Sequence, residues 1–132
     1  MKFTETHPAP NGELALQIIA MPKDTNAEGD IYAGWLVSQM DIAAATTAAR
    51  ISKGRTATVA IQGMEFLSPV RVGSQVKCYS RLLDIGRSSM KIQMEVWTQD
   101  PLENQPRKVT EATFVFVAID ENGCIRKVPA RD

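Results

Sequence analysis

The fold of this chain is decided by the stretch Ile31-Tyr-Ala-Gly-Trp-Leu-Val-Ser-Gln-Met-Asp-Ile-Ala-Ala-Ala-Thr-Thr-Ala-Ala-Arg50. Between Ile31 and Ala49 it contains a single charged side chain, Asp41. When successive residues are placed about 100° apart around a helix axis, apolar side chains fall on nearly the whole circumference. Such a helix is buried on most of its surface, so the remaining sequence must supply its cover.

Large apolar side chains occupy both sides of this helix. Leu36 and Met40 belong to one side, and Trp35 and Ile42 belong to the other. A membrane span is disfavoured, because the run is near the lower length limit and holds an acid and several hydroxyl groups that are costly in hydrocarbon. Asp41 lies on the side with the smallest residues, where another group is expected to approach the helix closely.

The bulk composition is that of one domain of ordinary size with no overall charge. The chain has 132 residues, 44% of them hydrophobic, and 15 basic and 15 acidic side chains. A single domain is expected over 1–132, with a flexible arm at 1–12 and a polar tail at 124–132. A sequence pI near 6.6 disfavours a general electrostatic attraction to nucleic acid or to an anionic membrane.

The cysteines and the N-terminus indicate the compartment. Cys78 and Cys124 show neither metal-ligand spacing nor a neighbouring pair of histidines, so both are predicted to be free, packed thiols. The first residues, Met1-Lys-Phe-Thr-Glu-Thr6, lack the apolar core of a signal peptide. The expected location is therefore the cytoplasm.

The rest of the chain has the pattern of strands and turns. A first strand is expected at 13–20, followed by a loop at 21–30 in which Asp30 is the helix N-cap or precedes it. The helix is expected to end near Gly54 in a left-handed cap. Further strands are expected at 56–66, where Gly63 marks either a bulge or a close approach of another backbone, and at 75–83, 89–97 and 109–119.

This order of elements predicts an α+β fold with a mainly antiparallel, five-stranded sheet around one helix. The strands at 75–83 and 89–97 should form a hairpin, and the strand at 109–119 should lie centrally because it is apolar on both faces. A five-stranded sheet cannot cover a helix that is apolar all round. A second subunit, most simply related by a two-fold axis, is expected to close the remaining side.

Side chains of the usual catalytic kinds are scarce. His7 is the sole histidine and lies in the N-terminal arm, and the sequence has no Gly-x-Ser-x-Gly elbow, phosphate loop, dinucleotide motif or metal-ligand spacing. Asp41 needs an explanation, because a buried carboxylate without partners is costly. The residues alone leave two interpretations of Asp41 open: a structural hydrogen bond or a catalytic role.

The start of the helix offers a second chemical element. Backbone N–H groups near Ala33, Gly34 and Trp35 lie at the positive end of the helix dipole, and Gly34 allows a ligand to approach closely. Asp41 lies about two turns, roughly 10 Å, further along the helix. In a dimer, the start of one helix and Asp41 of the other can meet at one carbon, an arrangement suited to attack on a thioester or ester carbonyl.

Several segments of the chain resemble a known family. They are Asp24 to Asp41, Thr56 to Val59, Gly63 to Gly73, Gly86-Arg-Ser-Ser89 and Thr110 to Phe114. Together they closely resemble the YciA-type acyl-CoA thioesterases of the hot-dog fold, and the resemblance extends from about Glu13 to Pro129. It implies a central helix in a curled antiparallel sheet, dimers that assemble as a trimer of dimers, and hydrolysis of acyl-CoA to a free acid and coenzyme A.

The resemblance also assigns residues to the reaction. The family's catalytic acid falls on Asp41, its active-site asparagine on Asn26 and its oxyanion-binding glycine on Gly34, each site drawing on both subunits of a dimer. Without the family, Asn26 is equally well explained as a turn residue. Two positions depart from the family: Ala33 stands where it usually has Gly, and Ser68 stands where it usually has Arg. Ala33 keeps its backbone N–H, whereas Ser68 removes either a phosphate contact or an interface ion pair.

A neutral protein must hold the phosphates of coenzyme A with a local cluster of cations. The residues expected to bind coenzyme A are Lys53, Arg55, Gly86, Arg87, Ser88 and Ser89. The three cations are assigned to the phosphates, with solvated surface charges as the alternative. The two serines are assigned to the pantetheine amides, with a plain turn as the alternative.

The sequence therefore predicts an acyl-CoA thioesterase that needs no cofactor or metal, since coenzyme A is part of the substrate and the product. Asp41 either activates water or attacks the carbonyl itself to form a mixed anhydride. A hot-dog hydratase or dehydratase is disfavoured because no histidine lies near the motifs, and a non-catalytic acyl-CoA binding module is disfavoured by the presence of Asp41 with Asn26. The acyl-chain length stays open, because it depends on packing across the dimer.

Overall fold

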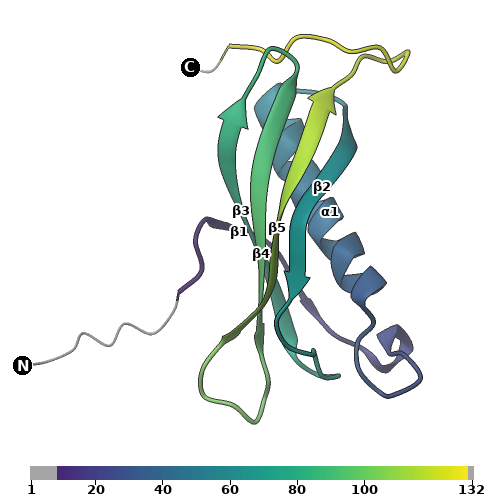
Figure 1. The fold of residues 1–132 in the computed structure, drawn as a ribbon, viewed down its shortest axis with the longest axis vertical. Coiled ribbons are helices and arrows are strands. Elements are labelled where there is room, and N and C mark those ends of the chain that lie inside the picture. The colour runs from purple at the N-terminus through teal and green to yellow at the C-terminus, as the bar shows by residue number, and fades with distance from the viewer. Residues whose placement is uncertain (1–8, 131–132) are drawn as a thin grey trace, which may run out of the picture.

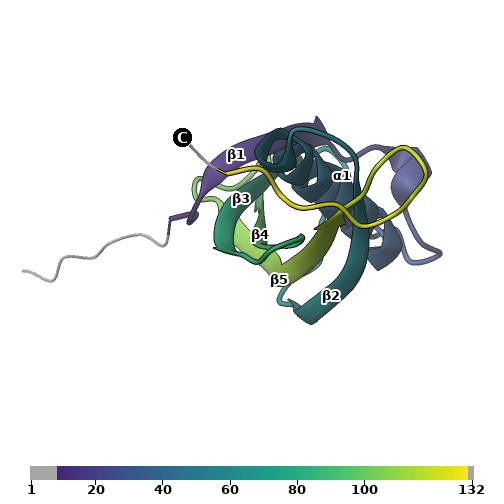
Figure 2. The same cartoon turned by 90° about the horizontal axis from the view of Figure 1, so that it is seen from above.

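The computed structural model describes residues 9–130, so the expectation for His7 lies outside the described residues. Its elements are β1 (Glu13–Ile19), the 3-10 helix η1 (Pro22–Asp24), α1 (Ala33–Ser52), β2 (Thr56–Phe66), β3 (Gln75–Ile85), β4 (Ser89–Gln99) and β5 (Arg107–Ala118). The five strands form one sheet that curls around α1 (Figures 1 and 2). The expected α+β architecture, a long helix in a curled five-stranded sheet, is confirmed.

Every neighbouring pair of strands is antiparallel, and their order across the sheet is β1-β3-β4-β5-β2. The expected hairpin joins β3 to β4. β5 is internal, as its apolar sequence predicts, but β4 is the middle strand. Phe114 and Phe116 of β5 are fully buried, whereas Val115 and Val117 on its other face are only half-buried.

The core lies between α1 and the concave face of the sheet. On β4 the alternating residues Met90, Ile92, Met94 and Val96 are fully buried, as predicted. The helix contributes Leu36, Met40, Ala43, Ala44 and Ala48 to the same core. Each large apolar side chain buried in this way contributes about 1.5–3 kcal/mol, and the helix alanines allow the backbone to lie close to the sheet.

The bounds of α1 agree with the prediction, but the residue that caps its C-terminal end does not. Tyr32 is the N-cap, and Asp30 lies before it. The left-handed cap at the C-terminal end is Lys53, with φ of 56° and ψ of 42°, so its assignment to Gly54 was wrong. Gly54 is needed for a different reason, because a Cβ atom there would lie 2.7 Å from a guanidinium nitrogen of Arg126.

β2 is an edge strand that pairs with β5 alone. Gly63 has φ of +66° and lies where the register shifts between Gln62 and Glu65, so of its two predicted roles the bulge is confirmed. Large apolar side chains remain open along this edge and on the neighbouring surface of α1: Ile42, Val59, Ile61, Phe66 and Leu67. Ile42 is 52% exposed, so the sheet leaves one apolar side of the helix uncovered.

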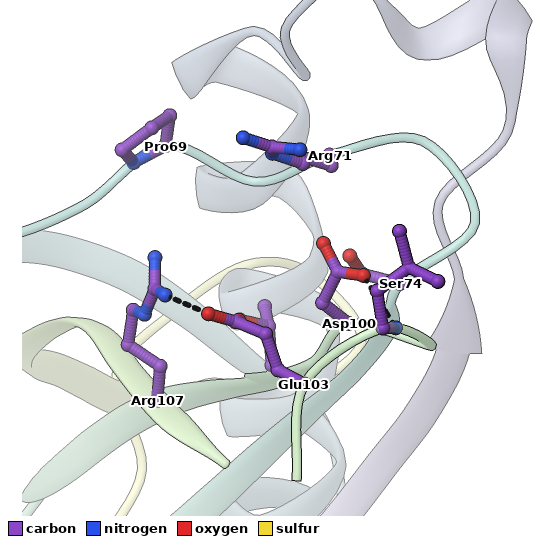
Figure 3. Close-up of a pocket in the computed structure, with 8 residues that line it drawn as sticks. Pro69, Arg71, Ser74, Asp100, Glu103 and Arg107 are labelled. Carbon is purple, nitrogen blue, oxygen red and sulfur yellow. Dashed lines mark hydrogen bonds and ion pairs between the residues drawn. The ribbon is translucent and has the colours of Figure 1, made fainter. Parts of the chain in front are cut away.

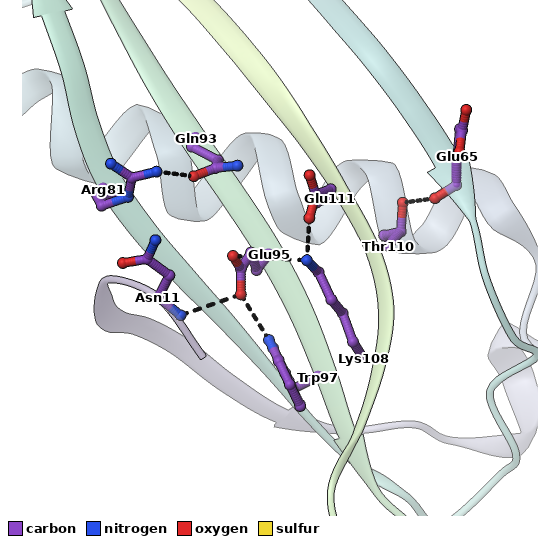
Figure 4. A network of polar contacts seen from close by, with 9 residues as sticks. All are labelled: Asn11, Glu65, Arg81, Gln93, Glu95, Trp97, Lys108, Thr110 and Glu111. Carbon is purple, nitrogen blue, oxygen red and sulfur yellow. Dashed lines mark hydrogen bonds and ion pairs between the residues drawn. The ribbon is translucent and has the colours of Figure 1, made fainter. Parts of the chain in front are cut away.

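A buried acid lies on the outer face of the sheet, where the sequence pattern did not single it out (Figure 4). Glu95 is 5% exposed and accepts hydrogen bonds from Trp97 Nε1 at 2.9 Å and from the backbone N–H of Asn11 at 3.2 Å. Its other oxygen lies 3.8 Å from Lys108 Nζ, and Lys108 also pairs with Glu111. These partners satisfy Glu95, and they attach the last residues of the N-terminal arm to β4.

The C-terminal segment, predicted as a polar tail, packs against one end of the sheet (Figure 1). Val128 is 4% exposed, and its N–H donates to the carbonyl of Arg87 at 2.8 Å. Cys78 and Cys124 are both free, but only Cys78 is buried, so the expectation of packing was wrong for Cys124. Within the described residues, no helix is long and apolar enough to cross a membrane.

Candidate active site

Asp41 lies in the middle of α1, on the side next to the edge strand β2, and is half-buried. Thr58 of β2 donates a hydrogen bond from its Oγ1 to Asp41 Oδ1 at 2.7 Å. Within residues 9–130, Oδ2 of Asp41 accepts no hydrogen bond, so one carboxylate oxygen is held and the other can take a proton. Thr58 was not among the predicted site residues, although it lies in one of the family-like segments, Thr56 to Val59.

Asn26 lies in the loop before α1, and its orientation is fixed by its own turn. Its Oδ1 accepts hydrogen bonds from the backbone N–H groups of Glu28 at 2.9 Å and Asp30 at 3.1 Å. Because only the oxygen of the amide can accept these bonds, Nδ2 must point away from the turn. Asn26 therefore stabilises the turn, as one of its two interpretations predicts. Its amide N–H groups have no protein acceptor among the described residues.

The first turn of α1 provides fewer free donors than expected. The N–H of Trp35 donates to the carbonyl of Tyr32 at 3.1 Å, so its assignment as a free donor was wrong. For Ala33 and Gly34 the described part of the chain supplies no backbone acceptor. A Cβ atom on Gly34 would meet only the Tyr32 ring, at 3.4 Å, so the protomer itself does not require glycine at this position.

Asn26 and the helix start share an open groove of about 420 Å³. The groove is mostly apolar, and it is lined by Asn26, Asp30, Ile31, Ala33, Leu36, Phe66, Leu67, Ser68, Pro69 and Val70. Ser68 Oγ is buried there without a hydrogen-bond partner among residues 9–130. Asp41 and Thr58 do not line the groove, so a single protomer brings Asn26 to the helix start but not to Asp41.

The residues expected to bind coenzyme A gather at the other end of α1, where the sheet ends (Figure 1). They lie in two turns, and the end of β5 bonds to both: Ala118 N–H donates to Ser88 O at 2.8 Å, and Ile119 N–H donates to Arg55 O at 2.9 Å. Lys53 and Arg87 are exposed. None of the cations here forms an ion pair with a carboxylate of the described residues.

Two of these candidates already have structural contacts. Arg55 Nη1 donates to the carbonyls of Asp120 at 3.2 Å and Glu121 at 3.0 Å, which occupies part of its guanidinium. A Cβ atom on Gly86 would lie 2.7 Å from Ser89 Oγ, so the Ser89 side chain folds over the hairpin turn. Lys53 and Arg87 are therefore the cations most available to an incoming phosphate.

The cations near the C-terminal end of α1 are separated from Asp41 along the same helix. Ser52, the last residue of the helix, follows Asp41 by 11 positions. At 1.5 Å per residue this is about 16 Å along the axis. A long flexible arm, such as the pantetheine of coenzyme A, is the kind of group that joins an anionic end to a reactive carbonyl over such a distance.

A separate, smaller pocket of about 160 Å³ lies near the start of β3, the end of β4 and the start of β5 (Figure 3). Arg71, Ser74 and Asp100 line it, together with the ion pair between Glu103 and Arg107. Its acidic and basic side chains balance, and none of the predicted site residues lines it. In the described part of the chain, no group of three or more His, Cys, Asp or Glu residues is placed to hold a metal ion.

Comparisons with known proteins agree on one family. Residues 28–104 match the model of the thioesterase superfamily. The acyl-CoA thioester hydrolase YciA of Escherichia coli (strain K12) is 48% identical over 131 residues, covering 96% of this chain and 98% of that protein.

Solved structures give the same result. A hexameric thioesterase from Yersinia pestis is 50% identical, with a TM-score of 0.89 over 93% of this chain and all of that one. A second structure is an aspartate-to-alanine mutant of a hexameric broad specificity acyl-coenzyme A thioesterase. It is 45% identical, with a TM-score of 0.89, and the match covers 92% of this chain and 90% of that one.

Proposed function

The chain belongs to the thioesterase superfamily, and we propose that it is an acyl-CoA thioesterase that hydrolyses the thioester to a carboxylic acid and coenzyme A. The observation that carries this proposal is the Asp41 carboxylate, which Thr58 holds through one oxygen on the open side of a buried helix. The cations at the end of the same helix, which form no ion pair within residues 9–130, support coenzyme A as the leaving group. No cofactor is needed, and the two free thiols are in line with a cytoplasmic location.

The working unit is proposed to be a two-fold dimer formed through β2. An unpaired edge strand of 11 residues is a template for pairing with another chain. The apolar side chains along it, such as Ile61 and Phe66, would be covered by the partner. Two-fold pairing through β2 would extend the sheet and lay the two α1 helices side by side in opposite directions. Because solved relatives are hexamers, three such dimers are the proposed assembly.

The active site is proposed to lie at the seam between the two subunits. In one protomer the groove at Asn26 and the helix start does not include Asp41. With the two helices antiparallel, the start of one helix lies beside the middle of the other. Asp41 of one subunit would then face Asn26 and Gly34 of its partner across the thioester. The mostly apolar groove provides the place for the acyl chain.

The proposed reaction needs only these groups and water. The free oxygen of Asp41 takes a proton from water, and the oxygen of that water forms a bond to the thioester carbon. The N–H of Gly34 and the Asn26 amide stabilise the negative charge on the carbonyl oxygen. The tetrahedral intermediate then breaks its carbon–sulfur bond, and the proton returns to the departing thiolate. An attack by Asp41 itself, followed by hydrolysis of the mixed anhydride, uses the same residues.

Isotope labelling detects direct attack by Asp41. In a single turnover in ¹⁸O-water, direct attack followed by hydrolysis at the Asp41 carbonyl places the label in the enzyme carboxylate. Water activated by Asp41 places the label in the free acid instead. Mass spectrometry of the peptide that contains Asp41 measures the difference.

The function is tested with a panel of acyl-CoA substrates from short to long chains, with release of the coenzyme A thiol as the readout. We expect hydrolysis of several members, and at least about a hundredfold lower kcat in Asp41→Ala. The same panel measures the chain-length preference. A panel without any hydrolysis by the intact protein would rule the proposal out, and unchanged hydrolysis in Asp41→Ala would rule out the role of Asp41.

A further inference from the structure

Arg126 lies in the C-terminal segment, and all three nitrogens of its guanidinium donate hydrogen bonds inside the protein. Nε donates to the carbonyl of Ile119 at 2.8 Å, and Nη1 donates to the carbonyl of Ser52 at 2.8 Å. Nη2 donates to Ser52 Oγ and to the carbonyl of Arg55, each at 3.1 Å. The planar fork of arginine suits several acceptors at once, and here they belong to the end of α1, the start of β2 and the end of β5.

The turn between α1 and β2 is shaped around this side chain. A Cβ atom on Gly54 would lie 2.7 Å from Arg126 Nη2 and 3.2 Å from its central carbon, so glycine is required for the guanidinium to fit. The residues on each side of Gly54 are Lys53 and Arg55. Both are assigned to the phosphates of coenzyme A, and Arg126 therefore fixes the turn that presents them.

The same segment reaches the second part of the coenzyme A site. The N–H of Arg126 donates to the carbonyl of Ala118 at 3.0 Å, and two residues later the N–H of Val128 donates to the carbonyl of Arg87 at 2.8 Å. Val128 is buried, which anchors the segment. One short piece of chain thus joins the α1–β2 turn to the β3–β4 hairpin.

We propose that Arg126 is a positioning residue for coenzyme A, which holds the Lys53–Arg55 turn and, through its segment, the Arg87 hairpin in the arrangement that receives the phosphates. This inference rests on the proposed thioesterase function. Arg126 is proposed to act through these turns rather than by contact with the substrate, because four of its five N–H donors are used by protein acceptors. Losing the arrangement should weaken binding of the nucleotide end and leave chemistry at Asp41 intact.

The test compares two substrates with the same acyl group: acyl-CoA, and acyl-pantetheine, which lacks the phosphates. The variant Arg126→Lys keeps the charge but cannot serve the spread-out acceptors. We expect its KM for acyl-CoA to rise about tenfold, with kcat nearly unchanged and with kinetics on acyl-pantetheine like those of the intact protein. Gly54→Ala should raise the KM for acyl-CoA and leave the kinetics on acyl-pantetheine unchanged, because the new Cβ displaces the guanidinium. If Arg126→Lys does not fold, Gly54→Ala alone tests the role of Arg126.

Lys127→Met is the matched control, because it removes an exposed cation from the neighbouring position. Its KM for acyl-CoA should stay close to that of the intact protein. An unchanged KM in both Arg126→Lys and Gly54→Ala, or an equal loss on both substrates, would overturn the proposal. So would an equally large rise in Lys127→Met, because general charge would then explain the effect. If the intact protein hydrolyses no acyl-CoA, the proposed function fails, which is a separate outcome.

Discussion

At the scale of the residue, the proposed function depends most on Asp41. Thr58 fixes the position of its carboxylate. A carboxylate in the middle of an apolar helix is costly unless it is hydrogen-bonded. The Thr58 hydroxyl meets this need with a bond of 2.7 Å to one oxygen and leaves the other available. The two interpretations of Asp41 that the sequence left open are therefore compatible, because the structural bond prepares the oxygen that reacts.

Replacing Thr58 by Val tests this pairing without changing side-chain volume much. Valine keeps the strand propensity but removes the donor, so Asp41 is no longer held through Oδ1. We expect kcat for acyl-CoA to fall about tenfold while the melting temperature changes little. Thr56→Val is the control, since Thr56 lies on the same strand and its hydroxyl makes no hydrogen bond within residues 9–130. Equal kcat values for the two variants would contradict the role of Thr58.

Cys78 makes a prediction for stability at high pH. Burial in the core raises the pKa of its thiol from 9.0 to about 12. Between these values the unfolded chain loses the thiol proton while the folded chain keeps it, so folding stability falls as the pH rises. Intact protein should lose about 1.4 kcal/mol per pH unit more than Cys78→Ala above pH 9.

Denaturant unfolding at several pH values between 9 and 11 measures this slope. Cys124→Ala is the control, because Cys124 is exposed. That variant should follow the pH slope of the intact protein. A Cys78→Ala curve that runs parallel to the curve of the intact protein would show that the buried thiol does not contribute.

At the scale of the element, β2 is the strand on which assembly depends. None of its residues is fully buried, and one of its edges has no partner strand among residues 9–130. Edge strands of monomeric proteins are commonly protected by charges, especially lysine. β2 instead presents Val59, Ile61 and Phe66, which is typical of an edge that another chain covers.

Ile61→Lys is expected to weaken subunit pairing through β2. Ile61 is 42% exposed in the protomer, and a lysine at this position would have to enter an apolar interface. We expect the dimer dissociation constant to rise by more than about tenfold, and thioesterase activity to fall with it. Leu102→Lys is the control, since Leu102 is 89% exposed and lies outside the strands. Sedimentation velocity over a range of concentrations measures the dissociation constant of each variant. Identical profiles for the two variants would contradict the role of β2.

The elements themselves could be predicted from the sequence because their patterns are local. Alternation along β3 and β4 and the apolar circumference of α1 are set by neighbouring residues. The helix cap could not be predicted, because Gly54 is required by Arg126, which is distant in sequence and takes the place where a side chain would lie. For the site, the motifs indicated Asp41, Asn26 and Gly34. Thr58 and Arg126 were missed because each acts through a contact that only the tertiary fold creates.

At the scale of the whole molecule, the protomer is an incomplete enzyme in this account. It holds Asp41 and Thr58 on the open side of α1, and it holds Asn26 and the helix start in a separate groove. The proposed two-fold dimer would bring Asp41 of each subunit to the groove of the other, so each dimer would hold two complete sites. Each active site is therefore proposed to be shared between two subunits.

Mixing two inactive variants tests whether each active site is shared between two subunits. Asp41→Ala and Asn26→Ala are each expected to be nearly inactive alone, while a mixed dimer contains one site with both native residues. If the two variants are unfolded together and refolded at equal amounts, random pairing should restore about one quarter of the activity of the intact protein, measured as thiol release from acyl-CoA. Activity that stays at the level of the separate variants, although mixed dimers are detected by mass spectrometry, would contradict a shared site.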